Sequence, residues 1–305
     1  MSKILICGGS GLIGKAISKL LLQNNHQVVW LSRSEGSWQG IQKYKWDWTK
    51  NEIDENALND VEVVINLTGA GIVEKAWTKA YKKEIVDSRV KSIELLVQTL
   101  QKKNIRLKSF IGASATGYYG AEISKDVFHE NSGVGTDFLA DTCKKWENAY
   151  LPIKSLTDQF VIFRIGVVLD KNGGAYTKMS PPFKYGLGAA LDTGKQLLPW
   201  IHSHDLSRLF LFAINQPSLS GTYNAVSSEI SSNRYFSELL ARSFKKTVFL
   251  PNVPLWLLKL FLGERHITIS RGVIISNQKL LNAGFKFDYP DLRRAFNELK
   301  TTTST

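Results

Sequence analysis

The first tenth of the chain alternates short apolar runs with one helical pattern. Two runs, Lys3–Cys7 and Gln27–Leu31, are almost continuously apolar, which is typical of parallel strands covered on both faces. Between them apolar residues recur at helical spacing, at Ile13, Ala16, Ile17, Leu20 and Leu21. This order predicts a strand, a helix and a second strand joined by a right-handed crossover, and therefore a parallel sheet.

The same alternation continues as far as residue 165. Further strands are predicted at Lys43–Trp46, Val61–Asn66, Ser109–Ala113 and Gln159–Ile165, with helices over residues 90–100 and 138–150. Six strands with helical crossovers favour an α/β fold with a doubly wound parallel sheet of the Rossmann type. A ligand of such a sheet binds at the carboxyl ends of its strands.

The pattern changes after Gly166. Glycine, proline and aromatic residues crowd residues 172–200, which indicates loops, and helical patterns return near Leu206, Phe236 and Leu292. We predict a nucleotide-binding Rossmann domain over residues 1–168 and a smaller C-terminal substrate lobe over residues 169–305. Part of residues 200–226, around Asn224, is expected to return to the first sheet.

A glycine-rich turn follows the first predicted strand. The segment Gly8-Gly9-Ser10-Gly11-Leu12-Ile13-Gly14 has glycines at its first, fourth and seventh positions. Gly8 permits the tight turn, Gly11 lets the backbone approach a pyrophosphate, and Gly14 lets helix and strand pack closely. Free N–H groups at the helix N-terminus would hold the pyrophosphate. A turn without a ligand is the alternative, but the preceding strand and following helix favour a dinucleotide site.

The end of the second strand predicts which dinucleotide binds. An NAD site usually has an acidic residue there, whereas this strand ends with Ser32 followed by Arg33. A guanidinium can pair with a 2′-phosphate, so we expect NADP(H) to be preferred, with NAD(H) as an open alternative. Arg33 could instead face solvent. Asp47, after the third strand, is expected to contact the adenine amino group or to act as a turn residue.

Charge and cysteine content add few constraints. The chain of 305 residues carries 39 basic and 27 acidic residues, a net charge of +12 spread along its length, and no nucleic-acid-binding motif. The two cysteines, Cys7 and Cys143, form neither a disulfide framework nor a metal pattern. Neither a signal peptide nor a membrane span is recognised, because the most apolar later stretch contains Pro254 and Lys259. We therefore expect a cytoplasmic protein without nucleic-acid or membrane partners and without a metal; an oligomer stays open.

Several segments together resemble a known family. In order and spacing these are Asn66-Leu-Thr-Gly69, Ser88-Arg-Val90, Ser114-Ala-Thr-Gly-Tyr-Tyr-Gly120, Trp146-Glu147, Arg164-Ile-Gly-Val-Val-Leu169, Gly173-Gly174, Trp200-Ile-His202 with Asp205, and Gly284-Phe285. The chain resembles the extended short-chain dehydrogenase/reductases, and within them the sugar-nucleotide epimerases that carry a C-terminal domain of unknown function, here over about residues 250–298. The resemblance implies reversible hydride transfer between a nicotinamide cofactor and a polar substrate, with nucleotide-linked substrates among the candidates. It places Leu67, Thr68 and Gly69 beside the nicotinamide ribose.

The chain lacks the tyrosine and lysine that such enzymes use for proton exchange. Trp146-Glu147 sets the helix register, which puts Cys143 at the lysine position and Leu139 at the tyrosine position. A literal match, Tyr150-Leu-Pro-Ile-Lys154, lies too far along the chain and contains a helix-breaking proline. Either another group supplies the proton or no hydride chemistry occurs.

The candidate catalytic residues are Ser114, at the end of the fifth strand, and Tyr118 and Tyr119 just after it. For these residues, local hydrogen bonding and loop packing are the alternative roles. On family analogy, Lys195, Gln196 and Trp200 are candidate substrate contacts. His202 is a further candidate if it faces the cleft, and Asp205 is expected to cap a helix. The sequence thus favours an NADP(H)-dependent oxidoreductase or epimerase; the alternative is a non-catalytic NADP(H)-binding regulator or sensor.

Overall fold

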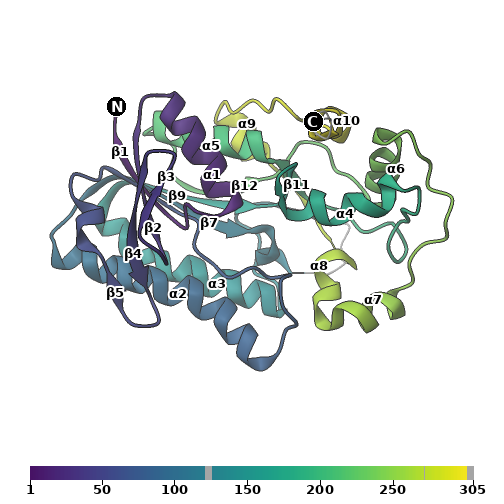
Figure 1. Ribbon diagram of the computed structural model, residues 1–305, viewed down its shortest axis with the longest axis horizontal. Coiled ribbons are helices and arrows are strands. Elements are labelled where there is room, and N and C mark those ends of the chain that lie inside the picture. The colour runs from purple at the N-terminus through teal and green to yellow at the C-terminus, as the bar shows by residue number, and fades with distance from the viewer. Residues whose placement is uncertain (121–125, 271, 301–305) are drawn as a thin grey trace.

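The computed structural model describes residues 1–120, 126–270 and 272–300, and a mostly parallel sheet lies at its centre (Figure 1). The parallel strands, in spatial order, are β4 (Ile41–Asp47), β2 (Gln27–Ser32), β1 (Lys3–Cys7), β6 (Val63–Asn66), β7 (Leu107–Ala115), β9 (Thr157–Ile165) and β12 (Gly221–Ala225). The order reverses between β1 and β6, as in a doubly wound sheet. The α/β Rossmann prediction is therefore confirmed.

Among the short strands that were not predicted, two pair with β4. β3 (Gly36–Trp38) pairs antiparallel with β4 at the sheet edge, and β5 (Glu52–Ile53) pairs antiparallel with the end of β4. At the other edge, β12 pairs in parallel with β9, so the chain returns to the first sheet after residue 220.

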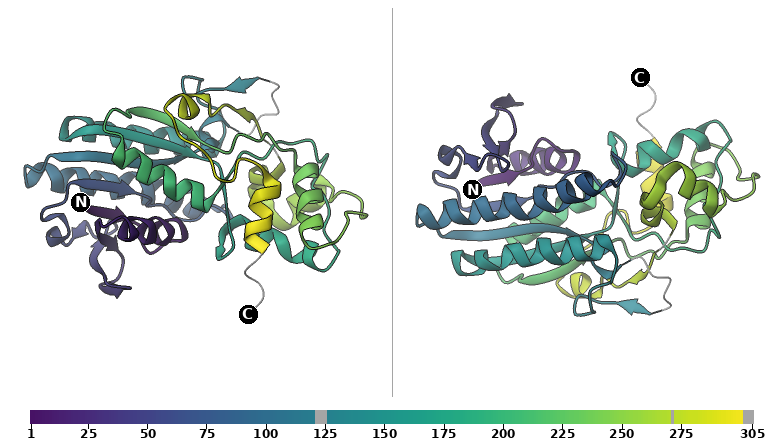
Figure 2. Two further views of the ribbon diagram at one scale, coloured as in Figure 1. Left: turned by 90° about the horizontal axis from the view of Figure 1, so that it is seen from above. Right: turned by 90° about the horizontal axis from the view of Figure 1, so that it is seen from below.

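Helices cover both faces of the sheet. α1 (Leu12–Gln23) and α5 (Ser203–Asn215) pack together on one face, and α2 (Lys79–Lys102) and α3 (Phe138–Tyr150) lie side by side on the other (Figure 2). The core strands are apolar on both sides because both sides are covered; Ile4, Leu5 and Ile6 have no exposed surface.

The second lobe lies beyond the carboxyl ends of the strands. It contains β10 (Val167–Asp170) paired with β11 (Trp200–His202), and the helices α4 (Gly174–Lys184), α6 (Asn233–Ser243), α7 (Leu255–Leu262), α8 (Ile267–Ser270), α9 (Gln278–Asn282) and α10 (Leu292–Lys300). Among these helices α9 differs in position, because it packs beside β12 of the first sheet and not within the second lobe. A small pair, β8 (Val127–Phe128) with β13 (Ile274–Ile275), completes the described strands. The lobe has a hydrophobic core of its own, formed mainly by β10, β11, α4, α6 and α10.

Candidate functional site

The turn between β1 and α1 is built around glycines that have no room for side chains. Gly8 adopts φ +81°, and a Cβ on Gly9 would lie 2.3 Å from the ring of buried Trp30. A Cβ on Gly14 would lie 2.6 Å from the Cα of Gly9, so helix and turn touch backbone to backbone. These contacts hold the start of α1 directly against the end of β1.

The N-terminus of α1 is open and uncapped. Its N-cap residue is Gly11, which offers no side chain to the first N–H groups, whereas Thr78 caps α2 and Asp137 caps α3. The nearest atom to a Cβ on Gly11 would be the carbonyl oxygen of Gly8, at 3.4 Å. The first turn of α1 includes Leu12, Ile13 and Gly14, and it leaves N–H groups free for an anion such as a pyrophosphate.

The end of β2 presents a free guanidinium. The Ser32 hydroxyl donates to the carbonyl of Ser34 over 2.5 Å and so shapes the turn itself. Arg33 is exposed, and within the described residues its side chain has neither a hydrogen bond nor an ion pair. Asp47 accepts two hydrogen bonds from Thr49, which lower the pKa of its carboxyl group. The predicted turn role of Asp47 is thus visible, and its contact with adenine stays a prediction.

The loop after β6 contains a buried hydroxyl without a partner. The amide N–H of Thr68 donates to the side chain of Asn66, and the Asn66 amide group donates to Tyr150. The Oγ1 atom of Thr68 is buried and has no hydrogen-bond partner among the described residues. Leu67 and Gly69 flank it at the carboxyl edge of the sheet. An orphaned hydroxyl next to an uncapped helix N-terminus fits the polar parts of a dinucleotide.

Ser114 belongs to a buried ionic network that the sequence did not predict. Its hydroxyl donates to Oε1 of Glu147 over 2.7 Å. Glu147 also receives two hydrogen bonds from Arg164, each 2.9 Å long, and only 11% and 4% of the two side chains are exposed. Burial alone would lower the pKa of Arg164, but the pairing with Glu147 raises it above its ordinary value. Glu147 and Arg164 are therefore held as a charged pair beside Ser114.

The two candidate tyrosines have different environments. Tyr119 is buried; its hydroxyl donates to Asn224 over 2.6 Å and accepts from Arg164 over 3.0 Å. Burial raises the pKa of Tyr119 despite these contacts. Tyr118 is partly exposed, stacks with its ring centroid 3.4 Å from the Arg164 guanidinium carbon, and has no hydrogen-bond partner for its hydroxyl among the described residues. Of the two tyrosines, Tyr118 is therefore the one whose hydroxyl is not engaged by another described residue.

The structure is consistent with the register derived for the missing pair. Leu139 and Cys143 both approach Gly117, so apolar and thiol groups occupy the two positions. Burial raises the pKa of Cys143 to about 12, which keeps the thiol neutral. The literal match at Tyr150 is a structural residue, because its hydroxyl is fully buried and bonded to Asn66 and to the carbonyl of Ala113.

The candidate substrate contacts of the second lobe differ in how far their side chains are exposed. Lys195 is exposed, whereas Trp200 has no exposed surface and lies in the core of the lobe. His202 is 3% exposed, and its ring contacts Glu298 of α10 at 3.1 Å. Burial therefore leaves neither Trp200 nor His202 a surface for a substrate, and the substrate contact of Lys195 stays a prediction.

One capping prediction was wrong. The ring of His202, rather than Asp205, caps α5 by accepting a hydrogen bond from the N–H of His204. Asp205 lies inside the first turn, fully buried, and accepts hydrogen bonds from the N–H groups of Asp288 and Tyr289. It ties the segment before α10 to α5.

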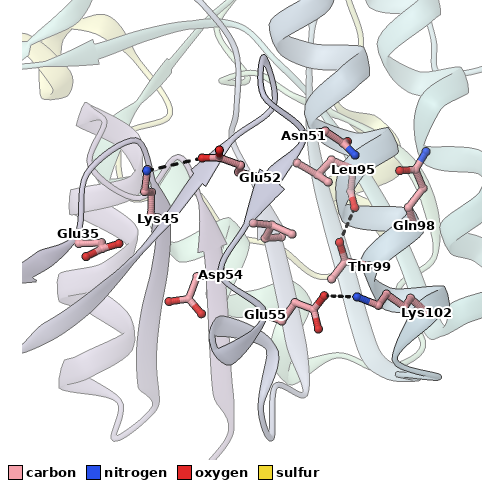
Figure 3. A pocket seen from close by; sticks show the side chains of 11 residues that line it. Glu35, Lys45, Asn51, Glu52, Asp54, Glu55, Leu95, Gln98, Thr99 and Lys102 are labelled. Carbon is pink, nitrogen blue, oxygen red and sulfur yellow. Dashed lines mark hydrogen bonds and ion pairs between the residues drawn. The ribbon is translucent and has the colours of Figure 1, made fainter.

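A polar cavity of about 480 Å³ opens between the β4–β5 hairpin and α2 (Figure 3). Two ion pairs lie among its lining side chains, Lys45 with Glu52 and Lys102 with Glu55. The described residues that line it include none of the predicted site residues. Within the described chain, no helix is long and apolar enough to cross a membrane.

Comparison with known proteins places these features in a family. Residues 4–137 match the NAD dependent epimerase/dehydratase family, and residues 253–299 match a domain of unknown function. An epimerase family protein of Mycobacterium bovis is 34% identical over 301 residues, which cover 98% of this chain and 97% of that protein. The human epimerase family protein SDR39U1, solved with NADPH, is 26% identical with a TM-score of 0.89, covering 98% and 99% of the two chains. A Thermus thermophilus UDP-glucose 4-epimerase, solved with NAD, shares the fold at 18% identity, covering 98% of this chain and 97% of that one, with a TM-score of 0.74.

Proposed function

The chain belongs to the NAD dependent epimerase/dehydratase family, and we propose that it is an NADP(H)-dependent oxidoreductase or epimerase. The uncapped α1 N-terminus behind Gly11 is the observation that carries the proposal, because a preformed anion site follows the first strand. Gly8, Ser10, Leu12, Ile13 and Gly14 complete the turn that would surround the pyrophosphate. The Thr68 hydroxyl would then gain the partner that it lacks.

The preference for NADP(H) rests on Arg33. Because its guanidinium has no partner in the described chain, pairing with a 2′-phosphate breaks no existing interaction. The human relative solved with NADPH supports this choice, whereas more distant proteins of the fold were solved with NAD. Ser32, which has no negative charge, would not repel the phosphate.

Substitution of Arg33 tests this preference. A charge-assisted hydrogen bond contributes roughly 1.5–3 kcal/mol, so Arg33→Ala is expected to weaken NADPH binding at least about tenfold. NADH has no 2′-phosphate, so its affinity should stay unchanged, and Arg33→Lys should retain part of the NADPH affinity. Equal loss for both cofactors, or no loss for either, contradicts the assignment.

The proposed reaction needs a proton donor other than the absent Tyr-x-x-x-Lys pair. A bound nicotinamide supplies or accepts a hydride at C4, and the chain must exchange a proton at the substrate oxygen. Tyr118 is the group that we assign to this exchange. Its ring lies on the Arg164 guanidinium, whose carbon is 3.4 Å from the ring centroid, so the paired Arg164 holds the phenol in place. Ser114 would orient the substrate oxygen, with its own proton directed to Glu147.

A non-catalytic regulator or sensor is the second candidate. It is favoured by Leu139 and Cys143 in the positions of the missing pair and by the enclosed hydroxyl of Tyr119. Incubation with stereospecifically deuterated NADPH and a panel of nucleotide-linked keto sugars separates the two functions. Transfer of the label to any carbonyl supports the enzyme; tight NADPH binding without transfer across the panel supports the sensor.

A further inference from the structure

Arg89 of α2 carries a positive charge and has no role in the proposed reaction. Its Nη1 group donates to the carbonyl oxygens of Ala70, over 3.1 Å, and Ile85, over 2.8 Å. The guanidinium carbon lies 4.8 Å from the ring centroid of Trp146. Both hydrogen bonds go to neutral carbonyl groups, and within the described chain no ion pair involves Arg89.

The ionisable groups around Arg89 do not neutralise it. Burial raises the pKa of Cys143 to about 12 and raises the pKa of Tyr150 and Tyr81 above their ordinary values. All three groups are therefore uncharged near neutral pH. Burial lowers the pKa of Arg89, but a guanidinium stays protonated in proteins. The carboxylate of Glu147, on the neighbouring helix α3, is paired with Arg164.

The charge lies directly behind the loop that follows β6. A Cβ on Gly69 would lie 2.7 Å from the guanidinium carbon of Arg89, so the backbone at Gly69 rests on this side chain. The neighbouring Ser88 hydroxyl accepts from the N–H of Ala70 while Arg89 holds its carbonyl. Two adjacent residues of α2 thus hold both backbone polar groups of Ala70, and they fix the position of the charge relative to that loop.

We propose that Arg89 makes the site discriminate between the redox states of the cofactor, favouring NADPH over NADP⁺. This rests on the proposed function, in which Gly69 lies beside the nicotinamide ribose. The oxidised nicotinamide ring carries a positive charge and the reduced ring is neutral, while both forms carry the same phosphates. A cation without a counter-charge behind Gly69 repels only the oxidised ring. The difference between the affinities for NADPH and NADP⁺ therefore isolates this repulsion.

The test is a pair of titrations for each variant. The intact protein is expected to bind NADPH about tenfold more tightly than NADP⁺, measured by calorimetry with each form. In Arg89→Met the ratio of the two dissociation constants should fall to about threefold or less, even if the loosened loop weakens both forms. Arg89→Lys retains the charge and should retain most of the ratio.

Lys91→Met is the matched control, because it removes an exposed positive charge from the same helix, where Lys91 pairs with Asp87. It should leave the ratio unchanged. Equal affinity of the intact protein for NADPH and NADP⁺, or an unchanged ratio in a folded Arg89→Met variant, overturns the inference while leaving NADP(H) binding in place. If neither form binds the intact protein, the proposed function itself fails.

Discussion

Removing the charge of Glu147 should destabilise the fold far more than removing a charge from the surface of the same helix. The carboxylate makes two parallel 2.9 Å hydrogen bonds to Arg164, and the two side chains are 11% and 4% exposed. Glu147→Gln keeps the side-chain shape but leaves the Arg164 cation buried without a counter-charge. Breaking such a pair from one side costs about 3–5 kcal/mol.

The expected change in melting temperature follows from this free energy. At the lower limit, about 3 kcal/mol corresponds to a decrease of roughly 5 °C in Tm for a chain of 305 residues. Circular dichroism at 222 nm and differential scanning fluorimetry both measure it. The matched control is Asp141→Asn, which breaks the exposed pair between Asp141 and Lys145 on the same helix and should cost less than about 0.5 kcal/mol.

A double-variant cycle separates the pair from its surroundings. In Glu147→Leu/Arg164→Met both charges are replaced by apolar groups, so the double variant should be more stable than the sum of the single effects predicts. The reasoning is refuted if Glu147→Gln melts within about 1 °C of Asp141→Asn, since the buried pair would then contribute no more than a surface pair.

Three further outcomes are expected. Gly9→Ala should lower the free energy of unfolding by about 1–3 kcal/mol, because its Cβ would overlap the Trp30 ring. Gly133→Ala, with open space around it, should not lower it. Equal melting points of the two variants would contradict the close packing of Gly9 against Trp30. Tyr118→Phe should reduce turnover about a hundredfold or more once a substrate is found, without changing NADPH affinity, and unchanged turnover removes it as the proton donor. Burial lowers the pKa of His202, so the stability that its neutral ring contributes is full above about pH 6.5 and is lost as the pH falls. His202→Gln should therefore flatten the decline in Tm between about pH 7.5 and 5.5. An identical slope in the variant would contradict this direction of the pH dependence.

The sequence predicted the elements whose pattern is local. β1 and β2 are apolar throughout because the sheet buries both faces, and the helix over Phe138–Tyr150 was predicted with the bounds that the structure shows. The hairpin strands β3 and β5 were missed because they are short and largely exposed, so they carry no apolar pattern.

The parts of the site that the sequence missed depend on contacts between distant segments. Glu147 served only to set a register. Arg164 lies inside the apolar second half of β9, and a charge there is a signal for a buried partner, but nothing local identifies that partner. The burial of His202 was not foreseen because Glu298, 96 residues later, covers it. Arg89 was recognised as part of a family segment, and its lack of a counter-charge became visible only in the fold.

The central claim is that the α1 N-terminus and Arg33 together hold NADP(H). Its most direct test is a parallel fluorescence titration of the purified protein with NADPH and NADH, after retained cofactor has been removed. We expect clearly tighter binding of NADPH, and no binding of either in Gly11→Val, whose side chain would project toward the proposed pyrophosphate. Equal binding of both would contradict the role of Arg33, and binding of neither to the unmodified protein would contradict the dinucleotide site itself.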